Sequence, residues 1–204
     1  MSKLQKYTRN TVCTWFFSVA ILLSAAVVHA QHNHGSEELR LYTETADLMG
    51  VKFDISLYAP SEKIAQQACH KAFLRISEIE TRLSNYQADS EISILCQTEG
   101  PVKVSDDLWF VLNESVFYWK VSEGAFDVTV GRITRLWRRA RRQKEFPQRS
   151  RIKQEMKFVG GDLMRLDAKS QAVEILKPGL LIDLGAIGKG YAADEALKVL
   201  QGFG

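Results

Sequence analysis

The sequence has few of the residues that build disulfide or zinc scaffolds. Only three of its 204 residues are cysteine, and none of them forms a CxxC pair. A small disulfide-stabilised domain would need more cysteine, and a zinc site would need Cys or His at close spacing. Both classes are therefore excluded. The 46% of apolar residues instead predict a globular domain that is held together by a hydrophobic core.

Nucleotide-binding fingerprints, internal repeats and membrane-length apolar runs are also missing. Neither a Walker A loop nor the dinucleotide-binding GxGxxG pattern occurs. The longest apolar run falls short of the ~20 residues that a spanning helix needs. After the first thirty residues two cysteines remain, Cys69 and Cys96. These two cysteines either form a disulfide in an oxidising compartment or remain as two buried thiols.

The first thirty residues have the pattern of a secretory signal peptide. A basic start precedes an apolar stretch, Trp15 to Val28, and Val28-His29-Ala30 carries small residues where signal peptidase cuts. We expect residues 1–30 to be removed, residues 31–38 to form a flexible tail, and residues 39–204 to form the domain. The expected location is therefore the periplasm, in solution or at the outer face of the inner membrane, with a membrane anchor as the alternative.

Net charge gives no support for nucleic-acid binding. The chain has 27 Lys and Arg against 24 Asp and Glu, and three of the basic residues lie in the leader, so the mature chain is formally neutral. An arginine-rich segment, residues 132–144, nevertheless surrounds Leu136-Trp137. Either a solvated helix face or a contact with an anionic membrane surface or an acidic partner would account for it.

Periodicity predicts an α+β domain. Strands are expected at 39–45, 51–57 and 102–104, and a hairpin at 163–167 and 172–176. A long helix should begin after Ser61 with a core stripe from Ile64 to Leu83, and a second should run from Ser105 to Val121 with Trp109, Leu112, Val116 and Trp119 in the core. Residues 124–131 form a β-prone run.

The chain is organised around Gly179 to Asp194. An apolar run ends in Asp183, glycines follow, and Lys189 precedes a helical pattern from Tyr191 to Gln201, which predicts a strand, a glycine turn and a helix. Backbone N–H groups at such a turn and the positive end of a helix favour an anion. An ordinary tight connection with a solvated Asp and Lys is the alternative interpretation.

Two other residues stand out as candidates. Tyr86 lies in a polar loop, where it would stack on a flat ligand or cover the rim of the core. Asp127 is the one acid in the β-prone run, where it would cap a turn or accept hydrogen bonds from a ligand.

In combination and in this order, several motifs resemble the ApbE family of FAD:protein FMN transferases. They are Met49-Gly50, Leu83-Ser84-Asn85-Tyr86 with Ser90-Glu91-Ile92-Ser93, Gly124-Ala125-Phe126-Asp127-Val128-Thr129-Val130, Leu136-Trp137, and Asp183-Leu184-Gly185-Ala186-Ile187-Gly188-Lys189-Gly190-Tyr191-Ala192-Ala193-Asp194. The resemblance implies a single α+β domain with a mixed, largely antiparallel sheet and flanking helices.

The resemblance also implies a function. In this family FMN passes from FAD to a threonine hydroxyl of a partner protein, AMP leaves, and Mg²⁺ is required. The positions that match the FAD site are Met49, Tyr86, Ala125, Phe126, Asp127, Asp183 and Lys189, and the backbone carbonyl of Ala186 matches a magnesium ligand. No catalytic residue can be assigned.

The sequence departs from the family pattern in three places. The family continues for a further stretch that carries an Asp and a Thr as magnesium ligands, so the chain resembles the N-terminal portion of a domain truncated at its C-terminus. Val51 replaces a common Thr, and Cys96 replaces a common Asn. Alternatives to the transferase are therefore an exported FAD-binding protein, an FAD pyrophosphatase, an inactive fragment, or an interaction module that uses the arginine-rich segment.

Overall fold

The computed structural model describes residues 38–203, and the compact unit considered below begins at Leu41. The predicted signal peptide and nearly all of the predicted tail lie outside the described residues. No helix within these residues combines the length and the apolar character needed to cross a membrane.

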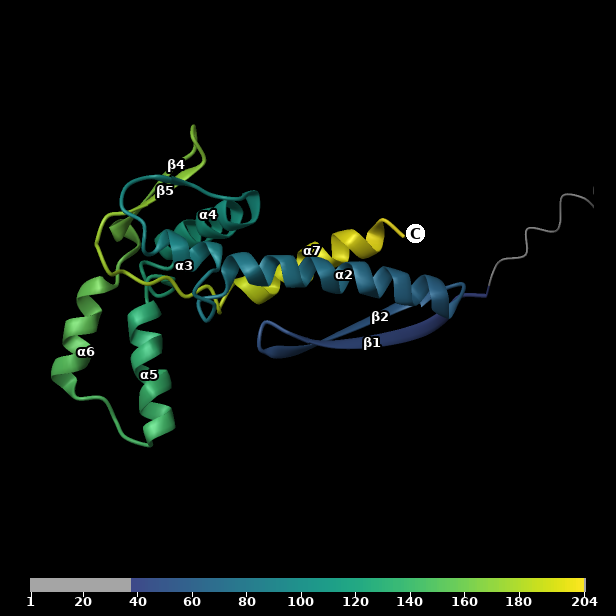
Figure 1. The fold of residues 1–204 in the computed structure, drawn as a ribbon, viewed down its shortest axis with the longest axis horizontal. Coiled ribbons are helices and arrows are strands. Elements are labelled where there is room, and N and C mark those ends of the chain that lie inside the picture. Colours follow the sequence, from purple (N-terminus) through teal and green to yellow (C-terminus); the bar gives the residue numbers. More distant parts are fainter. Residues whose placement is uncertain (1–37, 204) are drawn as a thin grey trace, which may run out of the picture. The chain divides into compact units, whose positions relative to one another are not determined.

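The unit begins with a hairpin of two nine-residue strands, β1 (Arg40–Leu48) and β2 (Val51–Ala59), which form a two-stranded sheet (Figure 1). Met49 and Gly50 make the turn, with φ values of 52° and 70°. A two-residue hairpin turn of this kind needs positive φ at both positions, which glycine adopts freely and Met49 adopts at some cost. The turn therefore fixes the direction of the Met49 side chain.

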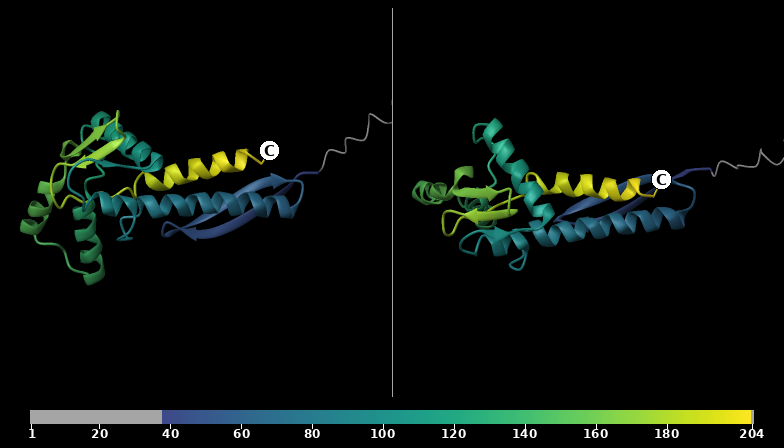
Figure 2. Two further views of the ribbon diagram at one scale, coloured as in Figure 1. Left: turned by 45° about the horizontal axis from the view of Figure 1, so that its top comes forward. Right: turned by 90° about the horizontal axis from the view of Figure 1, so that it is seen from above.

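The longest helix, α2 (Glu62–Leu83), begins where the sequence predicts. The Ser61 hydroxyl accepts a hydrogen bond from the backbone N–H of Ile64, which caps the helix. Its stripe from Ala68 to Leu83 is buried, whereas Ile64 is 36% exposed and lies outside the core. The C-terminal helix α7 (Gly188–Gln201) runs alongside α2 in both views of Figure 2.

A second group of elements packs against one end of α2. It comprises α3 (Glu91–Leu95), α4 (Asp106–Val121) and a three-stranded antiparallel sheet in the order β3 (Val102–Lys103), β5 (Ala172–Ile175), β4 (Met164–Asp167). The predicted hairpin is thereby confirmed. The core face of α4 differs in part from the prediction. Of the four predicted core residues only Leu112 is fully buried, while Trp109 and Val116 are partly buried against the core. The apolar residues buried with Leu112 are Leu108 and Val111.

The predicted strand that ends in Asp183 does not form, and the β-prone run at residues 124–131 does not form a strand either. Residues 124–130 and 179–183 are turns and extended chain that meet in an isolated parallel bridge between Val130 and Leu181, and Gly131 begins the next helix. The Gly131 N–H donates to the Leu181 carbonyl at 3.0 Å, and a Cβ at Gly131 would lie 2.4 Å from that oxygen. The two backbones therefore approach so closely at Gly131 that a side chain there would require a shift.

The chain between these two runs is mostly helical. The arginine-rich segment forms α5 (Gly131–Gln143), followed by α6 (Arg149–Glu155) and the short 3₁₀ helices η1 (Met156–Phe158) and η2 (Gly161–Leu163). The α+β class with flanking helices is confirmed, although the strands lie in two small antiparallel sheets instead of one. One core joins α2, α3, α4, α7 and the β3-β5-β4 sheet.

Candidate functional site

A cavity of about 1130 Å³ lies where the β1–β2 turn, the end of α2, α5 and the start of α7 meet. All eight residues that the sequence predicts for the site line it: Met49, Tyr86, Ala125, Phe126, Asp127, Asp183, Ala186 and Lys189. The structure thus brings together four segments that are far apart in the chain. Their roles toward a ligand stay predictions.

Asp183 is held by three hydrogen bonds. One carboxylate oxygen accepts from the Thr134 hydroxyl at 2.7 Å and from the Arg138 guanidinium at 2.8 Å, while the other accepts from the Gly185 N–H at 3.0 Å. Its side chain is only 9% exposed. These hydrogen bonds join the glycine turn to α5. The Asp183 side chain is therefore not solvated, as the alternative interpretation expected it to be.

The turn after Asp183 leads directly into α7, which begins at Gly188, three residues earlier than predicted. Lys189 therefore lies in the first helical turn, and its ammonium donates to the Gly185 carbonyl at 2.7 Å. Within the described residues the backbone N–H groups of Lys189 and Gly190 have no hydrogen-bond acceptor. Two free donors, a lysine and the positive end of a 14-residue helix favour an anion here.

Asp127 caps a turn, as the simpler of its two interpretations expected. Its Oδ1 accepts from the Thr129 N–H at 2.8 Å and from the Thr129 hydroxyl at 2.6 Å. The buried Thr129 hydroxyl in turn accepts from the Gly160 N–H at 2.8 Å. Among the described residues Oδ2 of Asp127 has no hydrogen-bond partner, so one oxygen remains for a ligand donor.

Tyr86 does not lie over the core, because 77% of its surface is exposed. The Arg138 guanidinium lies 4.3 Å from the centre of its ring and covers one face. The loop that carries Tyr86 is fixed by Ser90, whose buried hydroxyl donates to the Ser84 carbonyl at 2.6 Å. The aromatic ring is therefore presented to the cavity on an ordered loop.

Sequence reasoning missed the contribution of α5. Thr134, Trp137, Arg138 and Arg141 all line the cavity. Their three- and four-residue spacing places them on one helix face, which was the available signal. Arg138, Arg141 and Lys189 give this cavity more positive charge than the glycine turn alone.

One potential magnesium ligand is present. The carbonyl of Ala186 accepts no backbone hydrogen bond among the described residues, so its oxygen is free, and Mg²⁺ prefers oxygen ligands. No group of three His, Cys, Asp or Glu side chains within residues 38–203 is arranged to hold a metal. The chain thus fits magnesium as one backbone donor, with pyrophosphate oxygens able to supply others.

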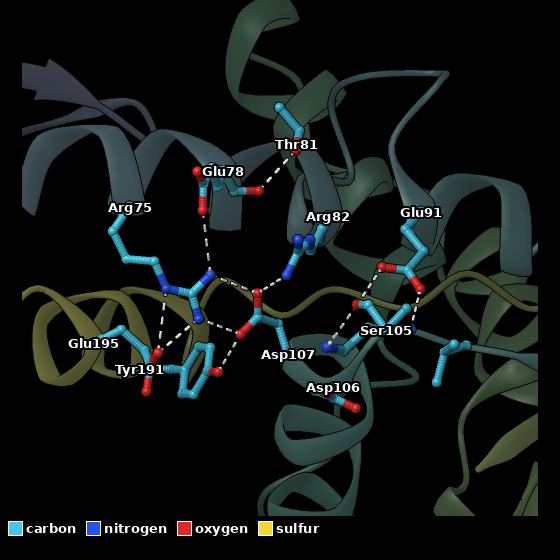
Figure 3. Close-up of polar contacts among 12 residues, drawn as sticks. Arg75, Glu78, Thr81, Arg82, Glu91, Ser105, Asp106, Asp107, Tyr191 and Glu195 are labelled. Carbon is cyan, nitrogen blue, oxygen red and sulfur yellow. Dashed lines mark hydrogen bonds and ion pairs between the residues drawn. The ribbon is translucent and has the colours of Figure 1, made fainter. Parts of the chain in front are cut away.

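A network of ion pairs and hydrogen bonds joins α2, α4 and α7 (Figure 3). Asp107 of α4 accepts from Arg75 at 2.8 and 2.5 Å, from Arg82, and from the Tyr191 hydroxyl, while Glu195 also accepts from Arg75. Burial opposes ionisation of Asp107, but the hydrogen bonds from Arg75 and Tyr191 outweigh it and lower its pKa from 3.8 to about 2.

The same network acts on the tyrosine. Burial and the hydrogen bond to Asp107 raise the pKa of Tyr191 well above its usual value of 10.0. Its ring stacks on Phe110, with centroids 5.3 Å apart. Tyr191, which belongs to the Lys-Gly-Tyr-Ala motif, therefore ties α7 to α4 and α2 and does not line the cavity.

Both cysteines outside the leader are free thiols, so the disulfide alternative is not realised. Burial raises the pKa of both. His70 is exposed on α2.

The comparisons with known proteins decide the family. A model of the ApbE family matches residues 49–204, more than half of the chain. The chain belongs to the ApbE family. It is 28% identical over 197 residues to the FAD:protein FMN transferase of Haemophilus influenzae, a match that covers 90% of this chain and 54% of that relative. It is also 28% identical over 164 residues to the Klebsiella pneumoniae protein of the same name, covering 79% and 51%.

Solved ApbE structures share the fold. The ApbE protein of Thermotoga maritima superposes with a TM-score of 0.73 at 26% identity, covering 80% of this chain and 53% of that one. The flavin transferase ApbE of Vibrio cholerae gives a TM-score of 0.72 at 23% identity, covering 81% and 54%, and supports the fold alone. The chain spans about half the length of the relatives that it matches.

Proposed function

We propose that this chain is part of an FAD:protein FMN transferase. The reaction breaks the pyrophosphate bond of FAD, joins the FMN phosphorus to a threonine hydroxyl oxygen of an acceptor protein, and releases AMP. A general base accepts the hydroxyl proton, and no residue among 38–203 is assigned to that role. Two relatives at 28% identity carry this activity in their names.

One observation carries the proposal: the eight residues implied by the ApbE resemblance, which come from four separate segments, line a single cavity of about 1130 Å³. Ligand pockets of a few hundred to about 1000 Å³ hold drug-sized molecules, so this one has room for a dinucleotide. The cavity combines an aromatic ring, free backbone donors and cations, which match the ring systems and the phosphates of FAD.

The chain's own residues divide the binding work. Lys189 and the free N–H groups at the start of α7 would bind the pyrophosphate, because both favour negative charge. Tyr86 would stack on a ring, and the free Oδ2 of Asp127 would accept a hydrogen bond from a ring N–H. Magnesium would take the Ala186 carbonyl as one ligand and neutralise charge on the phosphates.

We also propose that the protein acts in the periplasm, because the first thirty residues have the pattern of a cleaved secretory signal. Mass spectrometry of periplasmic protein should find a mature N-terminus at Gln31. A chain that retains residues 1–30 in the membrane fraction would contradict this location.

The activity is tested by incubating the chain with FAD, Mg²⁺ and a periplasmic extract. Released AMP is measured by chromatography, and covalent flavin is detected as fluorescence of a protein band after denaturing electrophoresis. AMP together with a labelled band supports the transferase. AMP without a fluorescent protein band points to the pyrophosphatase alternative. Bound FAD with neither product points to the FAD-binding alternative. Absence of FAD binding contradicts the transferase, the pyrophosphatase and the FAD-binding protein alike.

A further inference from the structure

A second hollow adjoins the cavity on the other side of Tyr86. This hollow, called the arginine groove below, has a volume of about 460 Å³ and lies between α3, the Tyr86 loop and α5. One wall of the groove carries Arg135, Arg138 and Arg142, and Asn85, Ser93 and Gln97 also line it.

Two of the three arginines are unpaired. Arg138 is bound to Asp183, but Arg135 and Arg142 are exposed and have no acidic group within 4.0 Å among residues 38–203. By contrast, Arg132 on the same helix is paired with Glu155. Like charges three to four residues apart on a helix destabilise it by a few tenths of a kcal/mol per pair. The unpaired guanidinium groups are therefore available to carboxylates from outside the chain.

The groove is continuous with the cavity. Asn85, Tyr86, Gln87 and Arg138 line both hollows, so the stacked Tyr86–Arg138 pair forms the wall between them. A polypeptide seated in the groove would have neighbouring residues within reach of the cavity. The amide side chains of Asn85 and Gln97 offer hydrogen bonds to its backbone.

We propose that the arginine groove binds an acidic segment of the polypeptide that accepts FMN. This proposal rests on the proposed function. Guanidinium groups bind carboxylates in paired, charge-assisted hydrogen bonds. Arg135 and Arg142 are seven residues apart, which is about 10 Å along the helix. A peptide in the polyproline II conformation rises about 3.1 Å per residue with three residues per turn, so it covers that distance in about three residues and brings side chains three positions apart to the same side. The fitting segment therefore carries two acids three positions apart.

A membrane surface fits these observations less well. Arg135 and Arg142 are exposed, but both line hollows, and a peptide can follow a concave surface more closely than a flat layer of lipid headgroups. The hollow also has polar amide walls suited to a peptide backbone.

The test uses a fluorescent twelve-residue peptide that contains one threonine and two aspartates three positions apart, and a matched peptide with asparagine in place of both aspartates. Fluorescence anisotropy measures binding to the 204-residue chain without FAD. The variant is R135Q/R142Q. The control is R139Q/R149Q, which removes the same charge from two exposed arginines that do not line the groove. FAD affinity is measured separately for each protein.

We expect the acidic peptide to bind R135Q/R142Q at least tenfold more weakly than the parent chain, with less than a twofold change in the control. The asparagine peptide should bind weakly to all three. FAD affinity should be unchanged, because neither Arg135 nor Arg142 lines the cavity.

Equal losses in the variant and the control, or equal affinity for the two peptides, would overturn the proposal. A second outcome would also overturn it. If vesicles of phosphatidylglycerol and phosphatidylcholine bound the parent chain but not R135Q/R142Q, while both proteins bound the acidic peptide equally well, the groove would be assigned to a membrane. Failure of the proposed function has a different signature: FAD would not bind any of the proteins, although the acidic peptide would still distinguish R135Q/R142Q from its control.

Discussion

The hydroxyl of Thr134 donates a 2.7 Å hydrogen bond to the carboxylate of Asp183, across 49 residues of sequence. Because Asp183 also binds Arg138 and the Gly185 N–H, it joins α5 to the glycine turn on which α7 begins. Asp183 is therefore a positioning residue for the cavity as well as a candidate contact for the dinucleotide.

Replacing Asp183 by alanine should destabilise the fold as well as the site. The change removes the charge-assisted hydrogen bond from Arg138 and the hydrogen bond from Thr134, and because Arg138 is partly exposed we expect a loss of about 1.5–3 kcal/mol. Asp183→Asn should cost less, because the amide oxygen can still accept from Thr134. Urea unfolding of both variants measures the difference, and equal stabilities would contradict the positioning role.

The Asp107 network predicts a specific dependence of stability on acid. The pKa of Asp107 is lowered from 3.8 to about 2 in the folded chain, so its contribution is fully present above about pH 4 and is lost as the pH falls toward 2. A shift of this size corresponds to about 2 kcal/mol of unfolding free energy. Urea unfolding between pH 2 and pH 5 should show the loss in the parent chain and a flatter profile in Asp107→Asn. Parallel profiles would contradict the assignment.

Local signals predicted the elements whose ends are fixed by local chemistry. Ser61 and Ser105 each cap the helix that follows, by hydrogen bonds to Ile64 and Leu108. The β-branched run Val128-Thr129-Val130 favours a strand, but none forms, because long-range contacts with Gly160 and Leu181 determine its conformation.

The site could be predicted only through family resemblance. Nothing in a local pattern indicates that Met49, Asp127 and Lys189 meet at one cavity. The bond from Tyr191 to Asp107 spans 84 residues and leaves no periodic signal, so the structural role of this motif tyrosine could not be read from the sequence.

Two glycines test the packing of the site region as a matched pair. A Cβ at Gly131 would meet the Leu181 carbonyl oxygen at 2.4 Å, whereas a Cβ at Gly190 would meet nothing within 4 Å. Gly131→Ala should therefore destabilise by about 1–3 kcal/mol, while Gly190→Ala, inside α7, should stabilise by about 0.5–1 kcal/mol. Thermal melts compare them, and a Gly131→Ala variant as stable as the parent would refute the close approach.

Isothermal titration of FAD in the presence of Mg²⁺ tests whether this cavity binds FAD. Lys189→Ala and Asp127→Ala are compared with the parent chain and with Lys63→Ala, an exposed lysine of α2 outside the cavity. Each site variant loses one charge-assisted hydrogen bond of about 1.5–3 kcal/mol, which is roughly a ten- to hundredfold loss of affinity. FAD binding in this cavity predicts these losses, with no change in Lys63→Ala. The melting temperature should stay near that of the parent in Lys189→Ala and fall in Asp127→Ala, because Asp127 also caps the turn at buried Thr129. Unchanged FAD affinity in both site variants would contradict FAD binding in this cavity.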